Sequence, residues 1–421
     1  MIAQQAIDYP EMVFETLAYH IDVDWLREAY RLTNKHSASG VDGVSSDSYA
    51  ANLEENLQDL HSRLKSGRYK APPVARVWLD KADGGKRPIG KPTFEDKIVQ
   101  RAVVMVLEAI YEQDFYEFSF AFRPGHSPHQ ALHQLREQCF EHNINWVIDA
   151  DIVGFFDALP HDLLRDMLKQ RVNDGGILKL IGKWLKAGVM EDEQISYAER
   201  GSPQGGVISP LLANLYLHHV LDDWFVKEVQ PRLKGRTMII RFADDFVIGF
   251  ELEADAQRVM ALLPKWFARF GLDLHPDKTR LIRFGRPDND PSQPHPPETF
   301  DFLGFTHYWA KSQRGKWVIK RKTAGKRVRR TIKAIWQWVK ENRHLPIKEL
   351  QRMLALKLQG HYQYFGIRGN YHHLTLIYQA ANEAWYYWLN RRSRLHNLVW
   401  EQFKKLSQRF PLPKPRIIHF I

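Results

Sequence analysis

The sequence predicts a mixed α/β fold that is followed by an α-helical C-terminal third. Two observations support this prediction. As far as about residue 310, short apolar runs typical of strands alternate with longer segments of helical periodicity. From about Thr331 to Phe410, apolar residues recur at helical spacing. At 421 residues, the chain is long enough for about two or three domains.

The first part of the chain is predicted to be mainly helical. Residues 24–64 have helical character, with a glycine-containing interruption at 37–45 (SASGVDGVS). Residues 69–93 indicate two short strands around a turn at 81–86 (KADGGK). Residues 94–112 predict a strong helix, because apolar side chains recur at helical spacing. These side chains belong to Ile98, Ala102, Val103, Val106, Leu107 and Ile110.

Strands and helices alternate in the middle of the chain. Residues 145–152 (NWVIDADI) predict a strand, and residues 239–250 (IIRFADDFVIGF) predict a strand, a tight turn and a second strand. Further strands are expected at 279–285 and 316–321, and a proline-rich surface loop at 288–299. Helices are expected at 161–172, 177–189, 211–229 and 256–272.

Three amphipathic helices are predicted in the C-terminal module. Each has one apolar face, so the three can share a core. The faces are formed by Ile332, Ile335, Trp336 and Val339, by Ile347, Leu350, Leu354, Leu358 and Phe365, and by Ile377, Ala381, Ala384, Trp385 and Trp388.

Composition favours an acidic partner and excludes several kinds of site. Lysine and arginine number 60 against 49 aspartates and glutamates, a formal net charge of +11, which favours a polyanion such as nucleic acid. The single cysteine, Cys139, excludes a disulfide framework and a zinc site with paired cysteines. No run approaches the roughly 20 apolar residues of a membrane span. We therefore expect a soluble protein of a reducing cytosol.

The positive charge is concentrated near the start of the helical module. Residues 302–340 include no acidic residue, and Trp309 and Trp317 lie among the lysines and arginines. A solvated surface is the simpler interpretation of a charge run, but this run leads into patterned helices, which favours contacts with RNA phosphates. The expected contacts come from residues between about Lys311 and Lys340, among them Lys326, Arg327, Arg329 and Arg330.

Aspartates provide the candidate catalytic chemistry. Asp149 and Asp151 alternate along a predicted strand and therefore point to the same side of it. Asp244 and Asp245 lie at the predicted hairpin turn. Clustered carboxylates with no lysine beside them along the chain suit Mg²⁺, and two such ions can stabilise both oxygens of a phosphoryl transfer. An isolated Asp-Asp turn is more often solvated, but the apolar flanks of this one indicate a buried sheet.

Eight motifs, in this order, resemble the reverse transcriptases of group II introns. They are GVDGVS, GKRPIGKPTFEDKIVQRAV, FAFRPGHSPHQAL, WVIDADIVGFFDALPHDLL, GSPQGGVISPLLANLYL, RFADDFVIGF, GLDLHPDKTRLI and FDFLGF. The resemblance covers about residues 25–410 and implies a right-hand polymerase. It places an N-terminal extension and the fingers, with part of the palm, at 1–145 and the palm at 146–310. A basic linker and an α-helical thumb or maturase domain follow at 311–410, and a short tail at 411–421.

The resemblance also implies roles for single residues. Asp151, Asp244 and Asp245 match catalytic aspartates that hold two Mg²⁺ ions, for which Mn²⁺ can substitute, whereas Asp149 matches no metal ligand. Phe156 matches an aromatic steric gate against the ribose 2′-OH, although an ordinary core phenylalanine would explain it equally well from sequence alone. Residues implied to lie near the incoming nucleotide are Lys86, Arg87, Phe156, Gln204 and Lys278. Phe242 replaces the tyrosine that is commoner in the family's box.

The implied function is RNA-templated DNA synthesis combined with binding of a structured intron RNA. The expected partners are an RNA template, a DNA or RNA primer and dNTPs. Some family members add an HNH-type nuclease domain, for which this sequence leaves little room, so we expect no target cleavage. Two alternatives stay open: a domesticated relative in defence, CRISPR adaptation or DNA repair, and a maturase that acts mainly as a splicing cofactor. The bulky Phe156 disfavours an RNA-dependent RNA polymerase.

Overall fold

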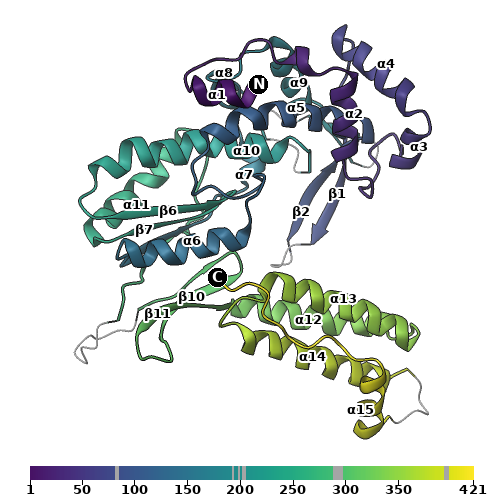
Figure 1. The fold of residues 1–421 in the computed structure, drawn as a ribbon, viewed down its shortest axis with the longest axis vertical. Helices are drawn as coiled ribbons and strands as arrows, with labels where there is room; N and C mark the ends of the chain where they lie inside the picture. The colour runs from purple at the N-terminus through teal and green to yellow at the C-terminus, as the bar shows by residue number, and fades with distance from the viewer. Residues whose placement is uncertain (81–84, 192–193, 198–199, 202–204, 288–296, 393–397) are drawn as a thin grey trace. The chain divides into compact units, whose positions relative to one another are not determined.

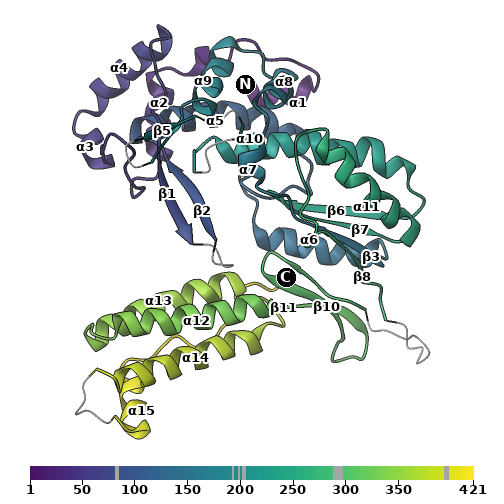
Figure 2. The same ribbon diagram turned by 180° about the vertical axis from the view of Figure 1, so that it is seen from behind.

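The computed structural model describes residues 1–80, 85–191, 194–197, 200–201, 205–287, 297–392 and 398–421 (Figures 1 and 2). The chain forms two compact units, one made of Met1–Ser127 and Ile148–Leu281 and the other of Pro128–Val147 and Ile282–Ile421. The fold class is mixed α/β, as predicted. The division into fingers, palm and thumb stays a prediction. Gln204, the centre of the turn predicted at 81–86 and most of the proline-rich loop lie outside the described residues.

Helix α5 is the centre of the N-terminal part of the first unit. All six of its predicted core residues are 0 % exposed. Both views show α1 and α2 lying against it (Figures 1 and 2). The helices here are α1 Ile2–Asp8, η1 Ala18–His20, α2 Val23–Leu32, α3 Ser46–Ala50, α4 Leu53–Lys65 and α5 Phe94–Asp114.

A small sheet follows these helices, in the strand order β2-β1-β4-β5. Strands β1 (Val74–Asp80) and β2 (Lys86–Lys91) form the predicted antiparallel pair, with Leu79 opposite Arg87. The short strands β4 (Val189–Glu191) and β5 (Gln194–Ser196) were not predicted. Gly205 lies so close to β2 that an added Cβ would be 2.3 Å from the carbonyl oxygen of Gly90.

A second sheet carries the predicted hairpin, and its strand order is β6-β7-β3-β8. Its strands are β6 Thr237–Phe242, β7 Asp245–Phe250, β3 Trp146–Ala150 and β8 Arg280–Arg283. Strands β6 and β7 are buried along almost their whole length, as their apolar sequences predicted. Helix α11 packs on β7 (Figures 1 and 2). The helices of this part are α7 Phe155–Ala158, α8 His161–Lys169, α9 Gly175–Leu185, α10 Ser209–Leu217 and α11 Glu253–Ala268.

The helix expected at 211–229 is not a uniform α-helix. It starts as α10 and continues as two π-helical segments, η2 His218–Asp222 and η3 Trp224–Val229, before the short turn η4 Gln230–Arg232. A π-turn changes the direction in which the following side chains point relative to an α-helix. In this segment the side chain of Asp222 is fully buried.

The second unit combines a three-stranded sheet with a helical core. The sheet has the order β11-β10-β9, and β9 and β10 were not predicted as strands. Helices α12, α13 and α14 lie side by side and bury the predicted apolar faces in one cluster (Figures 1 and 2). The elements are α6 Pro128–Glu141, β9 Phe300–Phe302, β10 Phe305–Lys311, β11 Trp317–Thr323, α12 Gly325–Asn342, α13 Ile347–Phe365, α14 Tyr371–Leu389 and α15 Trp400–Arg409. None of the helices in the described ranges has the length and apolarity to cross a membrane.

Candidate active site

The predicted catalytic aspartates lie at the ends of neighbouring strands. Strand β3 ends at Ala150, directly before Asp151, and its neighbour β7 begins at Asp245. Asp244 lies in the two-residue turn between β6 and β7. Burial raises the pKa of Asp244, and the negative charge of Asp151 raises it further. The negative charges of the two carboxylates therefore repel each other.

The turn that carries Asp244 has an unusual backbone. Ala243 has a φ of 59°, in the left-handed region that two-residue hairpin turns use and that glycine adopts most easily. A residue with a side chain in this region costs about 1 kcal/mol or more unless its surroundings hold it there. Such support is present, because Nη1 of Arg241 donates a hydrogen bond to the carbonyl oxygen of Ala243 at 3.3 Å.

Arg241 belongs to a buried ion pair that the sequence analysis missed. Its guanidinium donates to both carboxylate oxygens of Asp222, at 2.8 and 2.5 Å, and to the Asn214 amide oxygen at 3.1 Å. Arg241 and Asp222 are both 0 % exposed. Burial raises the pKa of Asp222, and the Arg241 guanidinium acts in the opposite direction. The sequence could have indicated this ion pair, because Arg241 lies in an otherwise apolar strand and a buried charge needs a partner.

The fold brings a lysine to the first aspartate, although none is near it in the sequence. Nζ of Lys278 lies 2.6 Å from Oδ2 of Asp151. The expectation that no lysine lies beside the carboxylates was therefore wrong for the folded protein. The side chains of Lys278 and Asp151 are 59 % and 40 % exposed, so this ion pair is weak and can be exchanged at low cost. Asp149 forms a separate pair with Arg280 at 3.3 Å.

Arg87, at the start of β2, has an electrostatic link to the carboxylate of Asp244. Its positive charge lowers the pKa of Asp244, so its guanidinium lies near the turn. Lys86 is exposed opposite Asp80 in the strand register. Gln204 lies outside the described residues, but the chain directly after it passes close to β2 at Gly205.

Phe156 lies in the short helix α7, directly after the strand that leads to Asp151. Its ring is only partly buried, and it contacts Phe155 edge to face with 5.4 Å between the ring centroids. Phe155 is the core residue of this pair, because only 2 % of it is exposed. Phe156 is therefore not a fully buried core residue, and its role as a steric gate stays a prediction.

The chemistry of the donor set fits a hard divalent cation. The aspartates offer only oxygen ligands, and the repulsion between Asp151 and Asp244 would be offset by bound positive charge. The described residues contain no group of three histidines, cysteines, aspartates or glutamates arranged to hold a metal ion. A cation that used Oδ2 of Asp151 would compete with Lys278, whereas Oδ1 accepts no hydrogen bond from that lysine.

The predicted RNA-binding residues lie in the second unit, on helix α12. Lys326, Arg327, Arg329 and Arg330 are exposed, and none forms an ion pair within the described part of the chain. Other residues of the basic window are structural. Arg321 is 3 % exposed and donates to the carbonyl oxygens of Leu132 and Ile421. The indole of Trp309 donates to the carbonyl oxygen of Phe284 at 2.6 Å.

Comparison with known proteins assigns the chain to a family. Residues 79–307 match the family model described as reverse transcriptase (RNA-dependent DNA polymerase). Protein YkfC of Escherichia coli K12 is 34 % identical over 319 residues, which are 67 % of this chain and 79 % of YkfC. The group II intron-encoded protein LtrA of Lactococcus lactis is 35 % identical over 231 residues. The nuclear intron maturase 2, mitochondrial, of Arabidopsis thaliana is 28 % identical over 284 residues. These last two matches each cover 55 % of this chain but only 38 % of LtrA and 37 % of the maturase.

Proposed function

The chain belongs to the reverse transcriptase family of RNA-directed DNA polymerases, and from this premise we propose that it extends a primer on an RNA template by phosphoryl transfer at Asp151, Asp244 and Asp245. The observation that carries the proposal is the electrostatic coupling of Asp151 and Asp244 at the ends of adjacent strands, with Arg87 beside them. This is a concentrated negative site with a positive group at its edge. It suits a metal-bound triphosphate.

Each residue of the site has a defined task in this proposal. Asp151, Asp244 and Asp245 would hold two Mg²⁺ ions, which when bound stabilise the attacking and the leaving oxygen. Arg87 would bind the triphosphate, because its charge faces the same site. Lys278, 2.6 Å from Asp151, would supply positive charge to the departing pyrophosphate. Phe156 would exclude the 2′-OH of a ribonucleotide.

The first prediction tests the carboxylates. Asp244→Ala should lower primer extension by several orders of magnitude, because it removes a ligand of the charge that stabilises the transition state. The measurement is single-turnover extension of an annealed DNA primer on an RNA template. Asp149→Asn is the matched control, since Asp149 pairs with Arg280 and is assigned no ligand role. Near-normal extension by Asp244→Ala, or an equal loss in the control, would end this proposal.

A second function, recognition of a structured intron RNA, is favoured by two further observations. Similar proteins carry the names group II intron-encoded protein and intron maturase, and α12 has exposed cations without acidic partners in the described ranges. We propose that the protein binds such an RNA and assists splicing and mobility. Intron RNA ends that flank the gene would support this role, whereas adjacent defence or repair genes would favour a domesticated one.

A further inference from the structure

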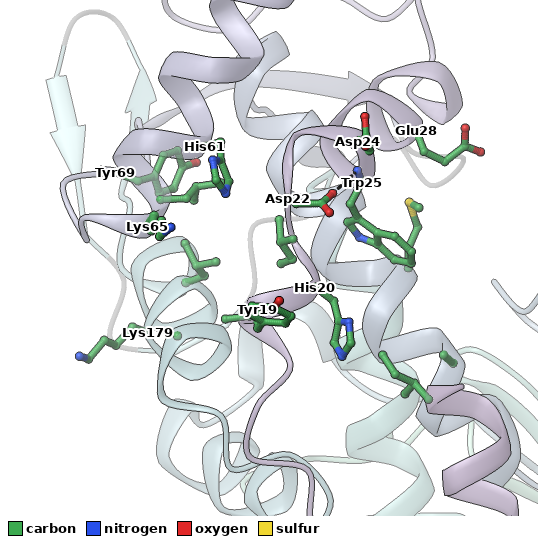
Figure 3. Close-up of a pocket in the computed structure, with 18 of the residues that line it drawn as sticks. Tyr19, His20, Asp22, Asp24, Trp25, Glu28, His61, Lys65, Tyr69 and Lys179 are labelled. Atoms are coloured by element: carbon green, nitrogen blue, oxygen red, sulfur yellow. Dashed lines mark hydrogen bonds between the residues drawn. The ribbon is translucent and has the colours of Figure 1, made fainter.

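Two cavities in the first unit flank helix α9. The large cavity has a volume of about 1340 Å³ and is lined by the N-terminal residues, the segment 18–28 and parts of α4, α5 and α9 (Figure 3). The small cavity has a volume of about 630 Å³ and lies along α8 and α9. Lys179 and Lys183 of α9 line both cavities. Neither cavity includes any of the catalytic aspartates.

Aromatic rings line the large cavity. Tyr19 is 87 % exposed, and its ring meets that of His20 edge to face with 5.9 Å between the centroids. Figure 3 shows these two residues across the cavity from Tyr69 and His61. Trp25 is fixed, because its indole donates to the carbonyl oxygen of Ala102 at 2.9 Å. Tyr69 is only 2 % exposed and forms part of the wall. The accessible ring is therefore that of Tyr19, which can stack with a planar ligand.

The wall that carries Tyr19 is fixed to α9 by one buried carboxylate. Oδ1 of Asp174 caps α9 by accepting from the Ile177 N–H at 2.9 Å. Its Oδ2 accepts from the Leu17 and Ala18 N–H groups, at 2.6 and 2.9 Å. Asp174 is only 4 % exposed. The turn that presents Tyr19 and His20 is therefore preorganised, and the start of α9 is already capped by protein.

Positively charged side chains outnumber acidic ones around the small cavity. The small cavity is lined by Lys70, Arg165, Lys179, Lys183 and Lys186 but by only one acid, Asp162, among the described residues. In the described part of the chain, none of these cations, nor Lys65 in the large cavity, forms an ion pair. Lys183 is nevertheless held, since it donates to the carbonyl oxygen of Gly67 at 3.4 Å.

Among the described residues, two of the three acids that line the large cavity are paired with arginines outside it. Asp24 pairs with Arg27, and Glu28 pairs with Arg31 at 2.6 Å. Figure 3 shows the carboxylates of Asp24 and Glu28 directed away from the other labelled residues. Asp22 accepts from the Trp25 N–H at 2.8 Å as the cap of α2.

We propose that these cavities form a second nucleic-acid site, in which single-stranded RNA places a base in the large cavity and its phosphates along the cations of α9. Unpaired cations beside accessible rings are the combination that binds single strands without reading sequence. A free nucleotide offers the same chemistry. Cations that line two cavities along α8 and α9 favour a strand, because successive phosphates of one strand can contact several of them. This proposal does not depend on polymerase activity.

The test uses the full chain and a fluorescent oligouridylate, with saturating primer–template duplex to occupy the polymerase site. The variant K65Q/K179Q/K186Q should weaken binding about tenfold. It should also reduce the slope of log affinity against log salt by about 0.7 for each phosphate that the variant no longer neutralises. Tyr19→Ala should weaken binding at least about fivefold, because stacking contributes about 1–3 kcal/mol per base. Lys183 is left in place because it contacts backbone carbonyls.

A matched control removes the same charge elsewhere on the first unit. Lys234, Arg258 and Lys265 are exposed, line neither cavity and form no side-chain ion pair in the described ranges. The variant K234Q/R258Q/K265Q should bind the oligouridylate almost like the wild type, as should Asp244→Ala. Equal losses in the two triple variants, or unchanged binding by both Tyr19→Ala and K65Q/K179Q/K186Q, would overturn the proposal. If these variants lose only binding of ATP and keep that of the oligouridylate, the strand assignment is wrong.

Discussion

Asp244 and Phe156 have different roles in the proposed reaction, and their surroundings differ in kind. The carboxylate of Asp244 is partly buried near Asp151, so its charge is disfavoured until positive charge is bound. The ring of Phe156 is partly exposed beside the buried Phe155. The charge of Asp244 therefore depends on nearby charged groups, whereas the proposed role of Phe156 depends on free space beside its ring.

A prediction at this scale concerns the choice of sugar. Phe156→Ala should increase incorporation of ribonucleotides relative to deoxynucleotides, because the shorter side chain leaves room for a 2′-OH. The ratio of kcat/KM for the two nucleotide types measures the effect. Phe155→Leu is the neighbouring control, since Phe155 is 2 % exposed and should affect stability more than selectivity. If Phe156→Ala discriminates as the wild type does, its ring is only part of the core.

The candidate site could be predicted from the sequence only where a residue belongs to a local pattern. Asp151, Asp244 and Asp245 were identifiable because an apolar strand precedes or surrounds each of them. The ion pair of Asp151 with Lys278 joins residues far apart in the chain, so no local pattern could reveal it. Arg241 was detectable as a charged residue in an apolar strand. Its partner Asp222 was not detectable, because it lies in the π-helical segment η2, where side chains no longer follow the α-helical period of α10.

At the scale of elements, the β6–β7 hairpin depends on a helix behind it. Arg241 connects Asp222 of η2 to the carbonyl oxygen of Ala243 at the turn. The same arginine is hydrogen bonded through its backbone N–H to the carbonyl oxygen of Phe118 at 2.8 Å. The position of Asp244 is thus set by contacts from a helix and a loop as well as by the hairpin itself.

Because Arg241 contacts both Asp222 and the turn, we predict that substitutions of this pair change stability and activity to different extents. Arg241→Met should destabilise the protein by about 3–5 kcal/mol, because it leaves the charge of Asp222 buried without a partner. The double variant Arg241→Met/Asp222→Leu should recover most of that stability. It still lacks the donor to Ala243, so we expect extension to stay reduced by about tenfold or more, as for a misplaced catalytic group. Urea unfolding and single-turnover extension measure the two effects. Full activity in the double variant would limit Arg241 to a role in stability.

Helix α12 gives a second prediction at this scale. Replacing Lys326, Arg327, Arg329 and Arg330 by glutamine should weaken binding to structured RNA and reduce its salt dependence. The slope should fall by about 0.7 to 0.9 for each phosphate that these side chains neutralise in the wild type. The effect should be similar across RNA sequences, because phosphate contacts carry no base information. Extension of a pre-bound short duplex should be affected less. An unchanged salt slope would show that this face of α12 is only solvated.

The length of an element helped to decide whether the sequence could predict it. Helix α5 has enough turns for its apolar repeat to be evident, and all predicted core positions are buried. Strands β5 and β9 have three residues each, which is too short for a two-residue period to be recognised. They form because neighbouring strands supply their hydrogen bonds.

For the whole molecule, sequence order and compact units do not coincide. The second unit takes Pro128–Val147 from the middle of the chain. Within it, Arg321 donates to the carbonyl oxygen of Leu132 at 2.9 Å, and His129 is 2.8 Å from the carbonyl oxygen of Tyr364. The segment 411–421, expected to be a short tail, also packs within this unit, since the Ile418 N–H donates to the carbonyl oxygen of Gly366 at 2.6 Å. Contacts of such separation have no local sequence signature.

Buried histidines in both units predict how stability responds to acid. His307 is 1 % exposed and stacks on Phe300 with 4.9 Å between the ring centroids. Burial lowers its pKa to about 3, and the nearby Arg321 acts in the same direction. Burial also lowers the pKa of His218 to about 3 and that of His361 to about 4. In the unfolded chain a histidine has a pKa of about 6.5.

Below about pH 6.5 the unfolded chain therefore takes up protons that the folded protein does not. The free energy of unfolding should fall with decreasing pH, by up to about 1.4 kcal/mol per pH unit for each such histidine. The glutamine in His307→Gln cannot bind a proton. Between pH 6 and pH 4 this variant should therefore take up about one proton fewer on unfolding, so its free energy of unfolding should depend less steeply on pH. Urea unfolding at several pH values measures this slope. His344→Gln makes the same substitution at an exposed position and serves as the matched control. An unaltered slope in His307→Gln would mean that His307 is protonated in the folded protein despite its burial, and that Arg321 is not close enough to oppose the charge.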